Sequence, residues 1–198
     1  MEFGPRALGN RSILGDPRNT RMQSTMNVKI KFRESFRPFA PSVLQEHTSE
    51  YFELATDKTS PYMLLVAEVA AGQRASNGDG DDNATLGFER LKQVRSTIPA
   101  VTHVDMSARV QTVSADRFPL YYKLIEAFEN QTGCPLLINT SFNVRGEPIV
   151  CTPEDAYRCF MNTNMDVLVV GRHVLIKSKQ PQRNLPPSDA YLKQFALD

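Results

Sequence analysis

Apolar side chains four residues apart mark the clearest helix of the chain. Residues 119–131 (PLYYKLIEAFENQ) place Leu120, Leu124 and Phe128 on one face of a helix, and Gly133 is expected to end it. The periodicity therefore predicts an amphipathic helix that presents this face to a core.

Three further segments are predicted to be helical. Residues 152–163 (TPEDAYRCFMNT) begin with Thr152 as the N-cap and Pro153 at the first helical position, where its missing N–H costs nothing. Residues 45–52 (QEHTSEYF) predict a short helix, and residues 20–31 (TRMQSTMNVKIK) can begin as one.

Extended segments alternate with these helices. Residues 61–70 (PYMLLVAEVA) predict a buried strand, residues 135–144 (PLLINTSFNV) a strand that runs into a polar turn, and residues 167–178 a hairpin around Gly171 and Arg172. Residues 102–113 alternate like a strand. Helices that alternate with strands predict the α/β (α+β) class with a mixed sheet, whose strand order the pattern does not define.

Other stretches have turn-forming or polar composition. Residues 72–87 (GQRASNGDGDDNATLG) predict a mobile loop, and the Pro- and Gln-rich residues after Lys179 predict a tail with at most one helical turn. No apolar run approaches the ~20 residues that a bilayer span needs, and no apolar secretory segment opens the chain. The odd number of cysteines, three, argues against a disulfide framework. We therefore expect reduced thiols, a cytoplasmic protein and no membrane partner.

Positive charge is concentrated near the start of the sequence. The net charge is only +1, yet residues 1–40 hold eight Lys and Arg against three Asp and Glu. This excess suits an anionic partner, although a solvated basic surface would give the same count. A pI near 7.7 lacks the strong basicity of a dedicated nucleic-acid binder, so nucleic acid is disfavoured as a partner.

Two basic motifs lie in this region. Arg6 stands beside Pro5 between two glycines, which allow backbone to approach a ligand while the guanidinium binds phosphate or carboxylate. A basic linker is the alternative. In residues 29–37 cations recur at even spacings, which on extended backbone would place them on one face. That face predicts a polyphosphate or acyl-phosphate site, or else a lysine-protected edge strand; its members are Lys29, Lys31, Arg33 and Arg37.

Two polar motifs follow on the predicted strands. His103, Asp105, Ser107 and Arg109 alternate along 102–113. Side chains that project in parallel cannot form a catalytic relay, so we interpret this set as ligand contacts or structural hydrogen bonds. At the end of the strand 135–144 stand Asn139, Ser141, Asn143 and Arg145. Their amides suit a ribose, a base edge or a carbamoyl amide, and turn capping is the alternative.

The sequence carries no standard metal or phosphate-binding motif. The three histidines have no ligand spacing, so no permanent metal is expected. Neither GxxxxGK[ST] nor GxGxxG is present. Mg²⁺ that arrives with a nucleotide is a separate matter.

Six segments in order resemble one family. EFGPRALGNRSIL, KFRESFRPFAPSVL, SPYML, THVDMSARVQTV, NTSFNVRGEPIV and TPEDA are similar to the C-terminal domain of the O-carbamoyltransferases of nodulation-factor and antibiotic biosynthesis. The similarity covers roughly residues 2–171. It implies a YrdC-like twisted mixed sheet with flanking helices. It further implies that residues 1–19 connect to a preceding ASKHA-type domain, that 20–180 form the YrdC-like domain, and that 181–198 are a tail.

The resemblance also implies chemistry. The domain would form carbamoyl-adenylate from carbamoyl phosphate and ATP, with Mg²⁺ on the nucleotide, and the preceding domain would pass the carbamoyl group to an acceptor hydroxyl. By resemblance Arg6, Lys31 and Arg37 form the phosphate clamp. The expected nucleotide contacts are Ser107, Arg109, Asn139, Ser141, Asn143 and Arg145. Met106 stands where the family often has Gly, which bears on the shape of the nucleotide pocket.

Two alternative functions remain open from the residues. The domain could bind nucleotide or RNA without turnover, because basic residues alone attract any polyanion. It could also be a scaffold that completes the acceptor site of the preceding domain.

Overall fold

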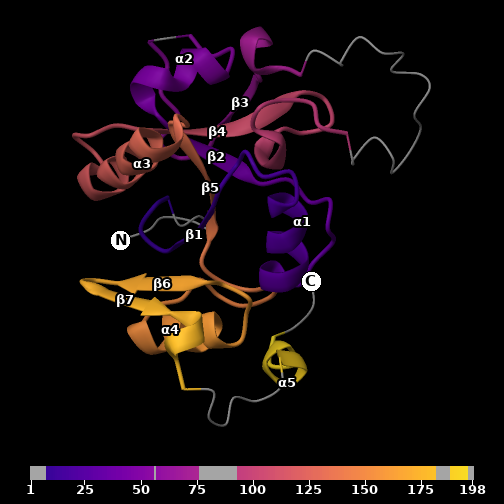
Figure 1. Cartoon of the computed structure of the whole chain (residues 1–198), viewed down its shortest axis with the longest axis vertical. Coiled ribbons are helices and arrows are strands. Elements are labelled where there is room, and N and C mark those ends of the chain that lie inside the picture. Colours follow the sequence, from indigo (N-terminus) through magenta and orange to yellow (C-terminus); the bar gives the residue numbers. More distant parts are fainter. Residues whose placement is uncertain (1–7, 56, 76–92, 182–187, 196–198) are drawn as a thin grey trace.

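A five-stranded mixed sheet forms the centre of the protein (Figure 1). The computed structural model describes residues 8–55, 57–75, 93–181 and 188–195. The sheet order is β1-β5-β2-β4-β3, in which β2 and β4 are parallel and the other neighbours antiparallel. The strands are β1 (Ser12–Gly15), β2 (Ala40–Leu44), β3 (Leu65–Glu68), β4 (Ser107–Val113) and β5 (Leu136–Ser141).

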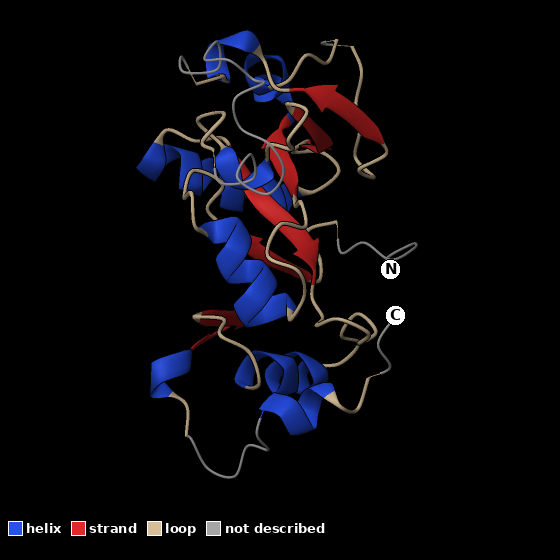
Figure 2. Ribbon diagram, turned by 90° about the vertical axis from the view of Figure 1, so that its right-hand side faces the viewer, coloured by secondary structure: helices blue, strands red, loops and turns tan. Residues whose placement is uncertain are grey.

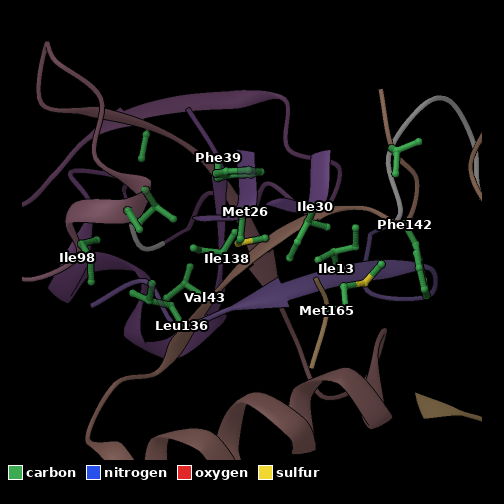
Figure 3. Close-up of a cluster of buried hydrophobic side chains, with 14 of the residues drawn as sticks. Ile13, Met26, Ile30, Phe39, Val43, Ile98, Leu136, Ile138, Phe142 and Met165 are labelled. Carbon is green, nitrogen blue, oxygen red and sulfur yellow. The ribbon is translucent and has the colours of Figure 1, made fainter. Parts of the chain in front are cut away.

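Helices cover both faces of this sheet. One face packs on α1 (Met22–Met26) and the π-helical turn Asn27–Lys31 that continues it, and Met26 and Ile30 belong to the same buried cluster as Val43 and Ile138 (Figure 3). The other face packs on α3 (Pro119–Thr132), mainly through Tyr121 and Ile125. The other short helices of this part are α2 (Thr48–Tyr51) and the 3₁₀ turns Gln45–His47, Ala71–Gln73 and Pro99–Val101.

A smaller layer lies beneath the main sheet (Figures 1 and 2). It contains α4 (Pro153–Met161), the hairpin β6 (Val167–Val170) and β7 (His173–Ile176), the 3₁₀ turn Lys177–Lys179, and α5 (Ser188–Leu192). Thr152 caps α4 in a reciprocal pair: its Oγ1 accepts from Asp155 N at 3.1 Å, and its own N–H donates to Asp155 Oδ2 at 3.1 Å. Phe160 and Leu168 join this layer to the core of the main sheet.

Most predicted elements are confirmed, including the mixed α/β class. The helices over 119–131, 152–163 and 45–52, the strand over 135–144 and the hairpin over 167–178 all form. Strand β1 lies within the predicted connection 1–19 and pairs with β5. The predicted loop 72–87 falls mostly outside the described residues.

Three expectations are wrong in part. The strand over 61–70 is a sheet edge rather than buried: only Ala67 of β3 is buried. In α3 the side chain of Leu120 is 84% exposed and Leu124 is also exposed, because the stripe that faces the sheet is Tyr121 and Ile125.

The third correction concerns the basic segment 29–37. Lys29 and Lys31 lie on the π-helical turn and not on extended backbone, so they do not share a strand face. Phe32 then adopts a left-handed conformation (φ +51°) and redirects the chain. As a result Lys29 is exposed, Lys31 is buried, and only the cations after the turn reach the face of the sheet described next.

Candidate functional site

Among the described residues, α3 covers only part of one face of the main sheet, and a cavity lies beyond the covered part. Leu44, Val113 and Leu137 pack against α3 on this face. Further along the same face, register pairs Ala40 with Asn139 and Val66 with Arg109. These side chains line a cavity of about 440 Å³ at the point where α3 no longer covers the sheet.

The polar lining of this cavity is strongly cationic. Its polar and charged members are Arg33, Arg37, His103, Arg109, Asn139, Thr140 and Ser141, and no acidic residue stands among the described residues that line it. Like charges held near each other raise the energy of the site unless an anion is bound. The cavity therefore has the electrostatics of an anion-binding site.

Arg33 is held in place from two sides. Its Nε donates to Asn27 Oδ1 at 2.6 Å, and its guanidinium lies 4.8 Å from the centre of the Phe39 ring. Burial, and then the positive charge of Arg37, lower the pKa of Arg33 to about 10, although the negative charge of Glu34 opposes the shift. The guanidinium stays protonated at neutral pH, so the site keeps this positive charge.

Three buried polar side chains, linked by hydrogen bonds, lie between the cavity and the apolar residues that pack on α3. Gln111 Nε2 donates to Pro61 O at 3.2 Å, and Gln111 Oε1 accepts from Ser42 Oγ and, at 2.7 Å, from Asn139 Nδ2. Ser42, Gln111 and Asn139 come from β2, β4 and β5. Nothing in the sequence pattern distinguished Gln111, because its role depends on which strands are neighbours.

Ser107 is hydrogen-bonded to both His103 and Asp105, as one of the two sequence interpretations allowed, but the expected parallel projection of these side chains is wrong. Residues 103–106 form a turn before β4, with Met106 at φ +65°, so their side chains do not project in parallel. The Ser107 hydroxyl donates to Asp105 Oδ1 at 2.6 Å and lies 3.2 Å from His103 Nδ1. The serine stands between the other two, which is not the order of a catalytic relay.

This arrangement defines the state of His103. Because the single hydroxyl proton of Ser107 goes to Asp105, a neutral His103 donates from Nδ1 and keeps a lone pair on Nε2. Burial lowers the pKa of His103, and the charge of Arg109 lowers it further while Asp105 opposes the shift. Neutral imidazole is therefore the favoured form at the edge of the cavity at pH 7.

Lys31 lies outside the cavity lining, in a buried network beside it. Its side chain is only slightly exposed, and Nζ donates to Ser141 O at 2.5 Å, Asn143 O at 2.8 Å and Asn143 Oδ1 at 2.7 Å. Burial lowers the pKa of Lys31 to about 7. In this conformation the ammonium uses all three donors to hold the segment after β5.

The predicted site residues thus fall into groups. The cavity brings together Arg37, Arg109, Asn139 and Ser141. Lys31 and Asn143 form the adjoining network, in which Asn143 Nδ2 donates to Glu147 O at 2.7 Å. Ser107 reaches the cavity edge only through His103, Arg145 pairs with Glu34 at 3.6 Å, and Arg6 lies outside the described residues.

Two other cavities are present, one beside the cationic cavity and one elsewhere on the sheet. A cavity of about 550 Å³ shares Pro38 and His103 with the cationic cavity and exposes the apolar side chains Phe36 and Val104. A third, of about 400 Å³, lies where β2 and β4 end, and Lys58 is its only lysine or arginine among the described lining residues. There Tyr122 donates to Glu46, and this bond raises the pKa of Tyr122 to about 12.

Two further features are absent from the described residues. No group of three or more His, Cys, Asp or Glu side chains is placed to hold a metal ion. No helix in the same part of the chain is long and apolar enough to cross a membrane.

The chain is similar to a known protein family over most of its length. The family model "Carbamoyltransferase C-terminus" matches residues 1–177. An uncharacterized protein of Synechocystis sp. is 59% identical over all 198 residues, which make up 31% of that relative. The nodulation protein NolO of Bradyrhizobium diazoefficiens is 45% identical over 89% of this chain and 28% of its own length.

A named transferase is also similar. The 3'-hydroxymethylcephem-O-carbamoyltransferase of Amycolatopsis lactamdurans is 36% identical over 86% of this chain and 28% of its own length. The chain therefore spans about a third or less of the length of these relatives.

Proposed function

The chain belongs to the carbamoyltransferase C-terminal family, and on that premise we propose that it forms carbamoyl-adenylate from carbamoyl phosphate and ATP. Carbamoyl phosphate, ATP and water give carbamoyl-adenylate, pyrophosphate and inorganic phosphate. The observation that carries the proposal is the cationic cavity on the open half of the sheet, because both substrates are phosphate anions.

The cavity lining supports this reaction by position and charge. Arg33, Arg37 and Arg109 would bind phosphate oxygens and the charge that develops when pyrophosphate leaves. Holding the carbamoyl oxygen in line with the α-phosphate would supply further rate by removing the entropy of encounter. The described lining offers no carboxylate, so Mg²⁺ in this proposal is held by the nucleotide phosphates.

The adjoining cavity would hold the base of the nucleotide. It shares the lining residues Pro38 and His103 with the cationic cavity, and Phe36 and Val104 give it apolar walls against which a planar ring can pack. The proposed ATP would then lie across both cavities, with its phosphates on the arginines.

The remaining steps belong to the longer protein. In the proposal, another domain transfers the carbamoyl group from the adenylate to an acceptor hydroxyl, in line with the name of the O-carbamoyltransferase relative. The free thiols Cys134, Cys151 and Cys159 fit the reducing cytoplasm, which is the location we propose.

Exchange of labelled pyrophosphate into ATP tests the proposal on this chain. We expect exchange that requires carbamoyl phosphate and Mg²⁺, that falls strongly in Arg109→Ala, and that is unchanged in Lys58→Ala. Lys58 is a matched control because it is an exposed cation of a different cavity. ATP binding without exchange, at the same ATP concentration, would instead favour a nucleotide-binding module.

RNA binding is the second candidate, since the same positive charge attracts any polyanion. A titration of RNA affinity against salt separates the two. A steep, sequence-independent loss of affinity, unaffected by competing ATP, would favour RNA. Competition by ATP would favour the nucleotide site.

A further inference from the structure

The amide of Asn139 has a defined orientation. Gln111 Nε2 donates to Pro61 O, so Gln111 must present its Oε1 on the opposite side. That oxygen already accepts from Ser42 Oγ, and it accepts from Asn139 Nδ2 at 2.7 Å. Reversing the Asn139 amide would bring two acceptor oxygens together, so Oδ1 is the atom directed away from Gln111.

The oxygen so placed has no hydrogen-bond partner among the described residues. Asn139 is 2% exposed, and its Oδ1 is buried without a donor within hydrogen-bond distance. A buried acceptor left unpaired is costly, because it has lost its hydrogen bonds to water and gained none in the protein. Because Asn139 lines the cavity, a ligand that supplies the missing donor would remove this cost.

A second asparagine has the same unpaired oxygen but a different place in the fold. Asn162 Oδ1 is also buried and unpartnered within the described structure, and Asn162 Nδ2 donates to Arg158 O at 2.9 Å. Asn162 ends α4 and lines none of the three cavities described above. Asn139 instead lines the cationic cavity, together with Arg37 and Arg109.

The chemistry of the cavity restricts the ligand group that Oδ1 can accept from. Arginine side chains carry only donors, so they match the phosphate and carbonyl oxygens of a substrate but not an N–H. We propose that Asn139 Oδ1 accepts a hydrogen bond from the NH₂ group of carbamoyl phosphate, and that this bond selects carbamoyl phosphate against acyl phosphates without an N–H. The inference rests on the proposed function and makes Asn139 a specificity residue within it.

Acetyl phosphate is the discriminating probe, because a methyl group replaces the NH₂ and leaves the phosphate unchanged. A site built to bond an N–H strongly rejects an analogue that lacks it, since its own acceptor is then left unpaired. For the wild-type chain we expect calorimetric Kd values about tenfold or more in favour of carbamoyl phosphate. Equal affinities would overturn the proposal without any variant.

Variants locate the preference. Asn139→Leu keeps the size of the side chain and removes the acceptor, so the preference should fall to about twofold or less, with inorganic phosphate binding retained as proof of an intact cavity. Asn162→Leu makes the same change outside the cavity and should keep the preference. Arg37→Ala should weaken both acyl phosphates alike. A preference that survives in Asn139→Leu would contradict the proposal.

The same variants distinguish the carbamoyl NH₂ from other possible donors. They also distinguish failure of this inference from failure of the proposed function. If Oδ1 accepts from a ribose hydroxyl, Asn139→Leu will abolish discrimination between ATP and 2′-deoxy-ATP and keep that between the acyl phosphates, which would overturn the inference. Failure of the wild-type chain to bind carbamoyl phosphate better than inorganic phosphate would overturn the inference and the proposed function together. If the chain binds carbamoyl phosphate more tightly than acetyl phosphate through Asn139 but shows no pyrophosphate exchange, the inference is supported and the proposed adenylation reaction is rejected.

Discussion

The two halves of one sheet face have opposite chemistry. Where α3 covers the face, Leu44, Val113 and Leu137 pack against Ile125. Where α3 ends, the same face carries Arg109 and Asn139 around a cavity. Buried apolar contact stabilises the fold, whereas clustered cations oppose it unless an anion is present. The comparison teaches that the apolar packing and the proposed binding site are separated along a single set of strands, with Ser42, Gln111 and Asn139 as the boundary.

The largest expected effect is loss of packing in the covered half. Ile125 is fully buried against the sheet, so Ile125→Ala should lower the free energy of unfolding by about 2–5 kcal/mol in urea denaturation. Arg109→Ala in the open half should change it by about 0.5 kcal/mol or less, because Arg109 is exposed. Similar losses of unfolding free energy in both variants would contradict the view that only the half covered by α3 stabilises the fold.

The next effect concerns binding in the open half. Arg37→Ala should weaken binding of ATP or carbamoyl phosphate by about 1.5–3 kcal/mol, the range of a hydrogen bond to a charged group. Calorimetric titration measures this, with Lys58→Ala as the control for loss of a cation elsewhere. Unchanged affinity would remove Arg37 from the binding site.

A smaller effect comes from the buried cation next to the cavity. The pKa of Lys31 is about 7 in the folded protein and 10.5 as the ordinary value, so the unfolded chain binds more protons between these values and stability rises with pH. The contribution should be about 1 kcal/mol between pH 7 and 8.

Lys31→Met isolates this contribution. The variant should be less stable at every pH, because carbonyl oxygens of Ser141 and Asn143 lose their donor, but it should lack the rise above pH 7. Denaturation curves from pH 6.5 to 9 measure both slopes. Parallel slopes would show that Lys31 does not titrate in this range.

The smallest effect tests which stripe of α3 faces the sheet. Leu120→Ser should change the free energy of unfolding by about 0.5 kcal/mol or less, because the side chain is mostly exposed. Thermal melting beside Ile125→Ala gives the comparison. A loss as large as that of Ile125→Ala would mean that the outer face of α3 is packed.

Local signals predicted the helices and turns well because their determinants are close in sequence. Thr152 caps α4 through hydrogen bonds with Asp155, which is only three residues further along the chain. Gly133 ends α3 with φ +71°, and its N–H donates to Glu129 O at 2.7 Å. The left-handed Phe32 had no such signal, since it is not a glycine. The two lysines before it lie on a helical turn, so the prediction that they share one face of a strand is wrong.

The sequence by itself determined the class of fold, the family and most of the polar residues that surround the cavity. Arg37, Arg109, Asn139 and Ser141 were identifiable because their residue types suit anions and amides. Tertiary structure decided which of them share a site. Only the pairing of β2 with β4 and β5 joins Gln111 to Asn139 and orients its amide, because hydrogen bonds between residues far apart in sequence depend on strand order and register.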